Sequence, residues 1–511
     1  MQKYNVIRNS VSGTFYGIIV NFLTMGGAFA TKTLLIYKLG VEYVGLDGLF
    51  ASILSFLNMA ELGFGTAVVF KLYKPIAENN VGEVNALLNY YRRIYRWIGL
   101  IILVVGLALT PFLSYIVDLN KVPDNINIYI LYLISLSTTV VSYLLYAYKN
   151  ALFNAHQRND LISKISGAVF CIQYVAQVCI LLFVPNFYLF ILILLFSRIL
   201  NNIGTAYYTK KYYPQYKCEG VLGKDVRSDI KHRIEALIYN KIGVTIINSS
   251  DNIIISKFLG LVTLGIYVAY YYIFTIIHTF FNVFRDALTA GIGNRIVTES
   301  VDTNYQLFNR IFFVYAWAAG ICSIGLAILY QPFMRLWVGE ERTLSMGFSI
   351  VMAIYFYFWI IRFVVHMFKN AQGLWWEDRF RPFCEGILNL ILNIMMVRHF
   401  GLFGVVLSTI IAMLTISVPW ETYVLFKVYF KRSMLPYFWE MTKWIILTVL
   451  SGVIAYYICQ LVSLNQILEF IIKTIICLLV PNVCFYLFWQ KSENIKYAMS
   501  TLSRIIHKNN K

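Results

Sequence analysis

The chain has 511 residues, of which 59% are hydrophobic and only 13% charged. Soluble domains carry about 25% charged residues, so this composition excludes a string of soluble domains. The formal net charge is +18, but the lysines and arginines are dispersed between apolar segments instead of gathering on one domain. That dispersal argues against nucleic acid as a partner. The sequence therefore predicts an all-α polytopic membrane protein.

Apolar runs of about 20 residues, each long enough to cross a bilayer as a helix, follow one another along the chain. The eight cysteines are scattered mostly inside these runs without a CxxC or a Cys/His ligand spacing. We therefore expect neither a disulfide framework nor a metal site. We predict about 14 transmembrane helices, at roughly residues 11–37, 45–70, 93–117, 127–148, 161–183, 186–208, 237–257, 262–284, 310–334, 346–368, 382–399, 401–426, 442–463 and 468–489.

The basic residues predict the orientation of these helices. Most of the 43 lysines and arginines fall in the N-terminal segment, in the loops that follow even-numbered helices, and in the C-terminal segment. Cytoplasmic loops of membrane proteins carry the excess of Lys and Arg. Both termini are therefore expected in the cytoplasm, with a bilayer as the surrounding phase.

Short motifs recur at a spacing of about 220 residues, which indicates a duplicated architecture. An even number of helices in each copy gives a parallel repeat, as in some transporters. We expect an N-lobe of six helices (1–209), a cytoplasmic linker (210–236), a C-lobe of six helices (237–430), and two further helices with a basic cytoplasmic tail (431–511). The recurring motifs are Lys149-Asn150-Ala151 with Lys369-Asn370-Ala371, Pro111-Phe112 and Val117 with Pro332-Phe333 and Val338, and Lys38, Gly40 and Gly45 with Lys257, Gly260 and Gly265.

Four blocks near the N-terminus carry a family pattern: Leu39-Gly40-Val41-Glu42-Tyr43-Val44-Gly45-Leu46, Ala60-Glu61-Leu62-Gly63-Phe64-Gly65, Leu72-Tyr73-Lys74-Pro75-Ile76-Ala77-Glu78-Asn79, and Ser142-Tyr143 with Tyr148-Lys149 and Gln157. Together they resemble the Wzx-type flippases of lipid-linked oligosaccharides and polysaccharides, within the multidrug/oligosaccharidyl-lipid/polysaccharide exporter superfamily. The motif-level similarity fades after the second lobe begins.

This resemblance implies two six-helix lobes around a cavity that opens to each side of the membrane in turn. It implies an undecaprenyl-pyrophosphate-linked repeat unit as substrate, moved from the inner to the outer leaflet of a bacterial cell membrane for capsule or other surface polysaccharide. The polysaccharide polymerase machinery is the protein partner that the resemblance suggests.

Ionisable residues inside the predicted spans are the candidates for function, because each costs about 2.5–3.5 kcal/mol to insert. Under the repeat, Lys32 and Asp251 occupy equivalent positions, six residues before Lys38 and Lys257. One hypothesis is a gate ion pair between them on the outer side. The alternative is that Lys32 extends toward the interface and that neighbouring Asn and Ser side chains cap Asp251.

Further charges lie in other predicted spans. Glu61 is a candidate for proton or cation coupling, for pairing with a basic cavity residue, or for a hydrogen bond to a neighbouring helix. Arg198 and Lys241 suit an anionic pyrophosphate, although Lys241 also suits the interface. Arg285 and Arg362 either form a basic ring at the cavity mouth or are ordinary cytoplasmic flanks. The isolated His278 and His366 are expected to pack in the core, with a proton relay as the alternative.

Three functions compete at this point. A lipid-linked oligosaccharide flippase fits the basic intramembrane residues. A lipid-linked peptidoglycan precursor flippase or a cation-coupled multidrug exporter of the same superfamily is the alternative. An enzyme such as a polymerase needs a long outer loop with catalytic residues, and no outer loop is long enough. We expect no catalytic residues and no cofactor, and protons, sodium or the membrane potential as the driving force.

Overall fold

The regular structure of the chain is entirely helical. The computed structural model describes residues 2–61, 63–497 and 500, and this part of the chain contains α-, 3₁₀- and π-helical elements but no strand. The all-α prediction is therefore confirmed. The end of the predicted basic tail, 501–511, lies outside the described residues.

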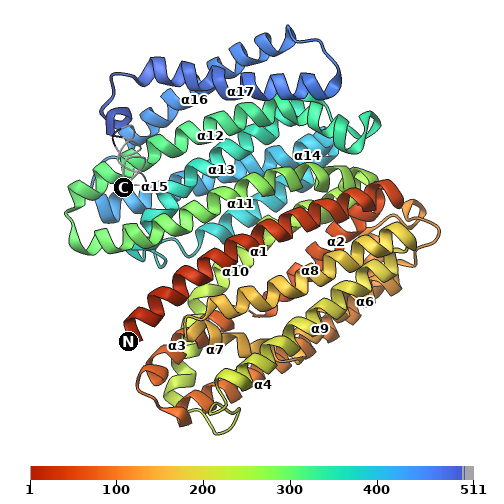
Figure 1. Ribbon diagram of the computed structural model, residues 1–511, viewed down its shortest axis with the longest axis vertical. Coiled ribbons are helices and arrows are strands. Elements are labelled where there is room, and N and C mark those ends of the chain that lie inside the picture. Colours follow the sequence, from red (N-terminus) through yellow and green to blue (C-terminus); the bar gives the residue numbers. More distant parts are fainter. Residues whose placement is uncertain (1, 62, 498–499, 501–511) are drawn as a thin grey trace. The chain divides into compact units, whose positions relative to one another are not determined.

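The chain divides into two compact units, one up to Ala269 and one from Tyr270 onward (Figure 1). This division places α10 and the first turns of α11 in unit 1. The six-plus-six division into lobes stays a prediction. Unit 1 contains α1 (Gln2–Lys38), α2 (Val41–Leu57), η1 (Asn58–Glu61), α3 (Phe64–Ala77), α4 (Val81–Leu109), η2 (Thr110–Phe112), α5 (Leu113–Ile116), η3 (Leu119–Lys121), α6 (Ile128–Leu144), η4 (Ala147–Lys149), α7 (Asn150–Ala155), α8 (Asn159–Phe183), α9 (Phe187–Tyr212), α10 (Lys224–Leu259) and the start of α11 (Leu261–Thr298).

The long helices of unit 1 pack side by side. α1 runs along α8, and α6 lies against both α4 and α9, as Figure 1 shows. Their outer faces carry exposed large apolar side chains such as Trp97, Val104 and Phe183. Exposed apolar surface on this scale is tolerated in contact with lipid chains and not in water. The exposed apolar faces of these long helices therefore identify a multi-pass membrane protein.

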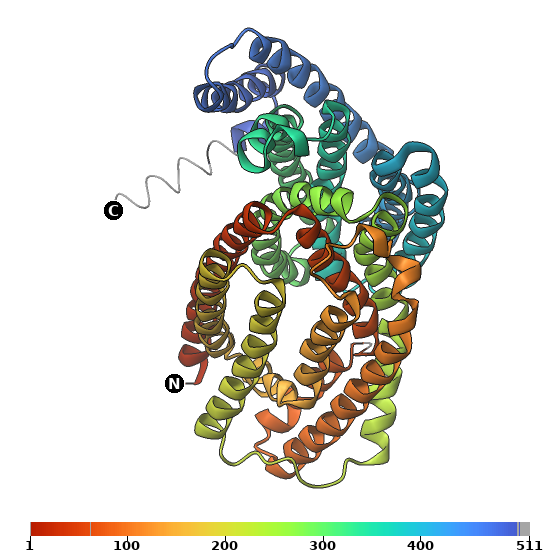
Figure 2. The same ribbon diagram turned by 90° about the vertical axis from the view of Figure 1, so that its right-hand side faces the viewer.

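Unit 2 is built around α12, which packs against α13, α16 and α17. The last two helices form a hairpin, visible in dark blue in Figure 2. Between Met413 and Phe430 the chain makes two π-helical stretches, which interrupt an otherwise α-helical span. Unit 2 contains the rest of α11, then α12 (Val301–Val338), η5 (Glu340–Arg342), α13 (Met346–Gln372), α14 (Arg381–Ala412), η6 (Met413–Ser417), α15 (Val418–Val424), η7 (Leu425–Phe430), α16 (Leu435–Gln460) and α17 (Gln466–Trp489).

The number of spans in the described chain is close to the prediction. Eleven helices are long and apolar enough to cross a membrane, or twelve if the bent pair α6 and α7 is one span. Besides this bent pair, two differences explain the lower number. The predicted spans 382–399 and 401–426 form one run, Arg381–Phe430, although Gly401 breaks its helical geometry. The predicted span 237–257 lies in α10, whose polar residues keep it outside this group of helices.

The glycines of the sequence repeat make equivalent turns. Gly40 joins α1 to α2 with a φ of 130°, and Gly260 joins α10 to α11 with a φ of 88°. Both values lie in the region that side chains with a Cβ rarely adopt, so glycine is required at both turns. This part of the repeat therefore recurs in the backbone as well as in the sequence.

The segment that connects α9 to α10 lies against the start of α4. The Lys217 amide donates to the Asn85 side chain over 2.7 Å, and Asn89 donates to the Gly220 carbonyl over 2.8 Å. Arg92 also donates to a carbonyl of this segment. The first half of the predicted linker is thus a loop held on unit 1, and the second half belongs to α10.

Candidate functional site

Two membrane helices of unit 1 are interrupted, and both interruptions lie at one place. The first interruption follows α2: the chain is a 3₁₀-helix in η1, which ends at Glu61. The α-helix resumes as α3 after Gly63, whose φ is 81°. The second span bends by 48° between α6 and α7, where Tyr146 has a φ of 44°. Broken helices inside a membrane leave backbone groups unpaired, which is tolerated where the backbone lines a cavity or is buried in protein.

Glu61 is held at the first interruption by two tyrosines. Tyr95 of α4 donates to Oε1 over 2.8 Å, and Tyr143 of α6 donates to Oε2 over 3.1 Å. Tyr91 in turn donates to the Tyr95 hydroxyl over 2.7 Å. Because Tyr143 comes from the last turn of α6, its bond to Glu61 joins the two interrupted spans. The expected hydrogen bond from a neighbouring helix to Glu61 is therefore present.

Gly65 makes this arrangement possible. A Cβ at this position would lie 2.9 Å from the Tyr91 hydroxyl and 3.0 Å from Oε1 of Glu61. Any side chain here would push the tyrosine or the carboxylate away. The glycine after the interruption is thus required by the close approach of polar groups from α4.

Glu61 borders a cavity of about 410 Å³ that lies wholly within unit 1. The lining combines three charged groups, a row of small hydroxyls and several rings. Such a volume falls in the range of about 300–1,000 Å³ that small-molecule sites occupy. The lining residues are Asp47, Phe50, Ala51, Leu54, Asn58, Glu61, Tyr95, Ser135, Thr138, Thr139, Ser142, Tyr143, Ala147, Ile191, Leu194 and Arg198.

Two polar groups of this lining have no partner among the described residues. Arg198 of α9 is exposed and makes no hydrogen bond or ion pair with the described part of the chain. The Oδ1 atom of Asn58 is buried and also lacks a partner there. A guanidinium at membrane depth normally has a partner, because an unpaired charge there is costly. The cavity therefore presents a cationic donor that is available to a ligand.

Lys32 and Asp251 both belong to unit 1. The Nζ atom of Lys32 lies 3.9 Å from Oδ2 of Asp47, a residue of the cavity lining. Asp251 is half-buried on α10. Its neighbour Asn252 donates to the Gly48 carbonyl and to the Ser52 hydroxyl of α2. These bonds fix this part of α10 against α2, and the pairing of Lys32 with Asp251 stays a prediction.

The other predicted basic residues are not among the residues that line this cavity. Lys241 is exposed on α10. Arg285 lies over the ring of Phe363 at 4.7 Å and bonds its neighbour Asp286 over 2.9 Å. Arg362 is partly buried in unit 2 among carboxylates. Of the seven predicted site residues, the described structure places Glu61 and Arg198 at one cavity and Lys32 beside it.

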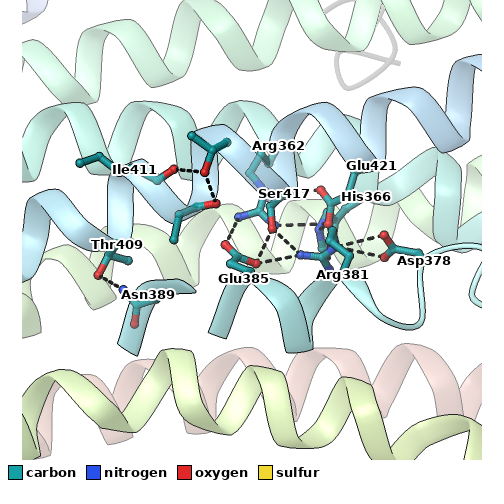
Figure 3. A network of polar contacts seen from close by, with 12 residues as sticks. Arg362, His366, Asp378, Arg381, Glu385, Asn389, Thr409, Ile411, Ser417 and Glu421 are labelled. Carbon is teal, nitrogen blue, oxygen red and sulfur yellow. Dashed lines mark hydrogen bonds and ion pairs between the residues drawn. The ribbon is translucent and has the colours of Figure 1, made fainter. Parts of the chain in front are cut away.

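Arg362 belongs to a buried charge network that joins α13, α14 and α15 (Figure 3). Arg381, at the start of α14, is its centre. Its guanidinium contacts Asp378 at 3.0 Å, Glu385 at 3.0 Å and Glu421 at 2.9 Å. Three different segments of the chain thus supply a carboxylate to one arginine.

The remaining members complete the neutralisation of this network. Arg362 lies 3.3 Å from Glu421, and Nε2 of His366 lies 2.6 Å from the same carboxylate. Lys369 pairs with Asp378 and lies 3.5 Å from Glu421. Three carboxylates therefore balance the two arginines and the lysine, and His366 adds an imidazole nitrogen. The arginines and the lysine thus already have carboxylate partners within the protein.

The π-helical stretch η6 extends this network. Ser417, its last residue, bonds Glu385 and accepts a hydrogen bond from Arg381 over 2.8 Å. Further along α14, Asn389 donates to Thr409 over 2.9 Å (Figure 3). A π-helix widens the turn and often marks a functional position. Here the π-helical stretch ends at Ser417, and Ser417 and Glu421 both contact Arg381.

Sequence reasoning missed most of this network. The expectation that His366 only packs in the core was incomplete, because it contacts Glu421. Glu385 and Glu421 lie inside predicted spans and could have been recognised as buried charges. Asp378 and Lys369 fall between the predicted spans 346–368 and 382–399, where charges are usual. Their pairing depends on tertiary structure.

The comparisons with known proteins agree with this architecture. The sequence pattern of the family described as "Polysaccharide biosynthesis protein" matches residues 10–289, more than half of the chain. No curated protein matches the sequence at a significant level. The solved structure of "Lipid II flippase MurJ, inward closed conformation" is similar, with a TM-score of 0.67 and 15% identity, over 94% of this chain and 99% of that one.

Two other solved structures share the fold. An inward-facing multidrug resistance MATE family transporter of the MOP superfamily has a TM-score of 0.65 and 10% identity, over 81% of this chain and 98% of that one. A MOP superfamily transporter from Pyrococcus furiosus has a TM-score of 0.52 and 12% identity, over 84% and 97%. At these identities the likeness concerns the fold. The chain belongs to the polysaccharide biosynthesis protein family and has the fold of the MOP superfamily transporters.

Proposed function

We propose that this protein is a flippase for undecaprenyl-pyrophosphate-linked oligosaccharide repeat units. It moves them from the inner to the outer leaflet of the bacterial cell membrane by alternating access, for the synthesis of capsule or another surface polysaccharide. The observation that carries the proposal is the cavity of unit 1, where two interrupted membrane helices meet. Arg198 lines this cavity and has no ion pair or hydrogen bond among the described residues. Membership in a polysaccharide biosynthesis family supports the same substrate class.

The architecture of the cavity supports transport more than catalysis. In transporters, interrupted helices form substrate and ion sites near the bilayer midplane. Glu61, Asp47 and Arg198 provide charged groups at such a site without a metal cluster among the described residues. We assign Glu61 the additional role of binding the coupling proton or sodium ion, with its two tyrosines as hydrogen-bond donors.

The outer gate forms the second part of the proposal. Lys32 and Asp251 pair across the outer side while the site is open to the cytoplasm, and they separate when it opens outward. Lys32 lies 3.9 Å from Asp47, a carboxylate of the cavity lining, and this distance supports a role for the lysine at the edge of the cavity. Lys241, Arg285 and Arg362 keep their proposed place on the cytoplasmic side, where both termini lie. The pyrophosphate approaches on this side, and the polymerase machinery takes over on the outer side after transfer.

Gene deletion followed by glycan profiling tests the proposal. We expect loss of surface polysaccharide and accumulation of an undecaprenyl-linked repeat unit that stays inaccessible to a membrane-impermeant periodate probe in intact spheroplasts. Reintroduced wild-type protein should restore both. Accumulation of a lipid-linked peptidoglycan precursor instead would identify the related flippase activity. Normal surface polysaccharide together with increased drug sensitivity would overturn the proposal in favour of an exporter.

A further inference from the structure

One face of α6 presents a row of small hydroxyls to the cavity of unit 1. Ser135, Thr138, Thr139 and Ser142 all belong to the lining. Their spacing of three, four and seven residues places them on a single side of the helix. This polar face is unusual in a span that is otherwise strongly apolar.

The hydroxyls of this row differ in their hydrogen bonds. Ser135 and Thr138 donate to backbone carbonyls one turn earlier, over 3.0 and 3.1 Å. Thr139 and Ser142 make no side-chain hydrogen bond within the described part of the chain. A polar group inside a membrane protein is costly unless it has a partner. Two hydroxyls of the row are therefore free to bind a ligand.

The charges around this row disfavour a phosphate. Arg198 is the single basic residue of the lining, whereas Asp47 and Glu61 are both acidic, and Lys32 outside the lining offsets only Asp47. A pyrophosphate carries several negative charges, and carboxylates in a medium of low dielectric constant repel it strongly. An uncharged ligand avoids this repulsion. If it carries hydroxyls, it also donates to the carboxylates and accepts from the guanidinium.

The rings and the amide of the lining suit the same kind of ligand. Phe50, Tyr95 and Tyr143 offer apolar surface, and Asn58 contributes its unpaired Oδ1. Apolar walls with a few convergent polar groups are typical of small-molecule sites. A sugar ring has both kinds of surface, since its C–H groups lie against rings while its hydroxyls bond side chains.

We propose that this cavity is a saccharide subsite, which binds a neutral sugar of the lipid-linked glycan while the pyrophosphate lies outside it. The hydroxyl row of α6, Glu61 and Arg198 bind the sugar hydroxyls, and the rings border its apolar face. This inference rests on the proposed function, because it names the part of the same substrate that enters unit 1. Arg198, which the sequence suggested for pyrophosphate binding, binds a sugar hydroxyl in this subsite.

Binding measurements on the purified full-length protein test the subsite. The probes are undecaprenyl pyrophosphate and the total lipid extract of the deletion strain, both applied in native mass spectrometry, where each bound lipid is recognised by its mass. We expect the wild type to bind the glycan-bearing lipid at least tenfold more tightly than undecaprenyl pyrophosphate. Thr139→Val and Glu61→Gln should reduce this ratio at least fivefold and leave binding of undecaprenyl pyrophosphate unchanged.

A matched control comes from the same helix. Ser137 is exposed, lies outside the cavity lining and donates to the Leu133 carbonyl. Ser137→Ala should therefore keep the full ratio. Thr139→Val preserves side-chain shape, so it remains informative if Glu61→Gln does not fold.

The outcomes separate this inference from the proposed function. Equal binding of both lipids by the wild type would overturn the saccharide subsite. So would variants that weaken binding of undecaprenyl pyrophosphate as much as that of the glycan-bearing lipid, since the cavity would then hold the pyrophosphate. If the extract contains no lipid-linked glycan, the proposed function fails, and the inference that rests on it fails with it.

Discussion

Gly45 and Gly265 hold the first turns of α2 and α11 in backbone contact. A Cβ on Gly265 would lie 1.9 Å from the carbonyl oxygen of Val41, and a Cβ on Gly45 would lie 2.3 Å from that of Leu261. Val41 and Leu261 are the first residues of these two helices. Each repeat-related glycine therefore accommodates the start of the other helix. Small residues at such contacts let membrane helices approach closely.

Substitution of Gly265 should open this contact. Gly265→Ala places a methyl group inside the van der Waals radius of a backbone oxygen, which no rotamer change relieves. We expect a loss of about 1–3 kcal/mol, as for other overpacked sites. A lower Tm of the purified protein in detergent would show it. Gly291→Ala is the control, because nothing lies within 4 Å of an added Cβ in the same helix. Equal Tm values for the two variants would contradict the prediction.

The charge network of unit 2 predicts a larger effect at Arg381. Arg381→Met leaves three carboxylates with fewer partners in a buried site, and loss of one member of a buried pair costs about 3–5 kcal/mol. We expect a loss of folded protein on size-exclusion chromatography or a strongly lowered Tm. Arg335 pairs with Glu340 over 3.7 Å at the surface. Arg335→Met should cost less than about 1 kcal/mol. Similar stability of both variants would show that the network contributes little.

The fold was more predictable from the sequence than the site. Long apolar runs identify membrane helices because the bilayer requires internally paired backbones. Glu61 and Arg198 were recognisable, since each is an isolated charge in an apolar run. Their convergence was not, because it depends on the interruptions at Glu61 and Tyr146, which local pattern does not reveal. The network around Arg381 also depends on long-range packing, and so the sequence alone showed only scattered charges.

His156 predicts a pH dependence at the connection between α7 and α8. Its ring lies 4.2 Å from that of Tyr213, its Nδ1 lies 2.8 Å from the Leu152 carbonyl, and Arg158 lies nearby. Burial, together with the charge of Arg158, lowers the pKa of His156 below its usual 6.5. The folded state therefore disfavours the protonated ring. The contribution of His156 to the free energy of unfolding is fully present above pH 6.5, and it falls as the pH drops through 6.5 toward the folded-state pKa.

His156→Gln should remove this component of the pH dependence. We expect the Tm difference between wild type and variant to shrink or reverse as the pH is lowered from 8 to 5, because only the wild type loses stability by protonation at this site. His399→Gln changes an exposed histidine and serves as the control. A constant difference across this pH range would contradict the expected role of His156.

Arg198 should be required for transport. Arg198→Gln removes the single basic group of the cavity lining while preserving some hydrogen-bonding capacity. A hydrogen bond to a charged group contributes about 1.5–3 kcal/mol, so we expect transport of the lipid-linked glycan to fall at least tenfold. Accumulation of the glycan on the inner leaflet measures this loss. Arg93→Gln, at an exposed arginine outside the lining, should transport normally. Normal transport by Arg198→Gln would remove Arg198 from the site.

The proposed outer gate is tested by exchanging its charges. Lys32→Asp and Asp251→Lys alone each place like charges opposite one another, which disfavours the state closed on the outside. The double variant restores an attractive pair, so it should transport more than either single variant. Because Lys32 also lies 3.9 Å from Asp47, the swap is expected to recover only part of the wild-type rate. Complementation of the deletion strain measures all three. If both single variants support wild-type levels of surface polysaccharide, the pair does not act as a gate.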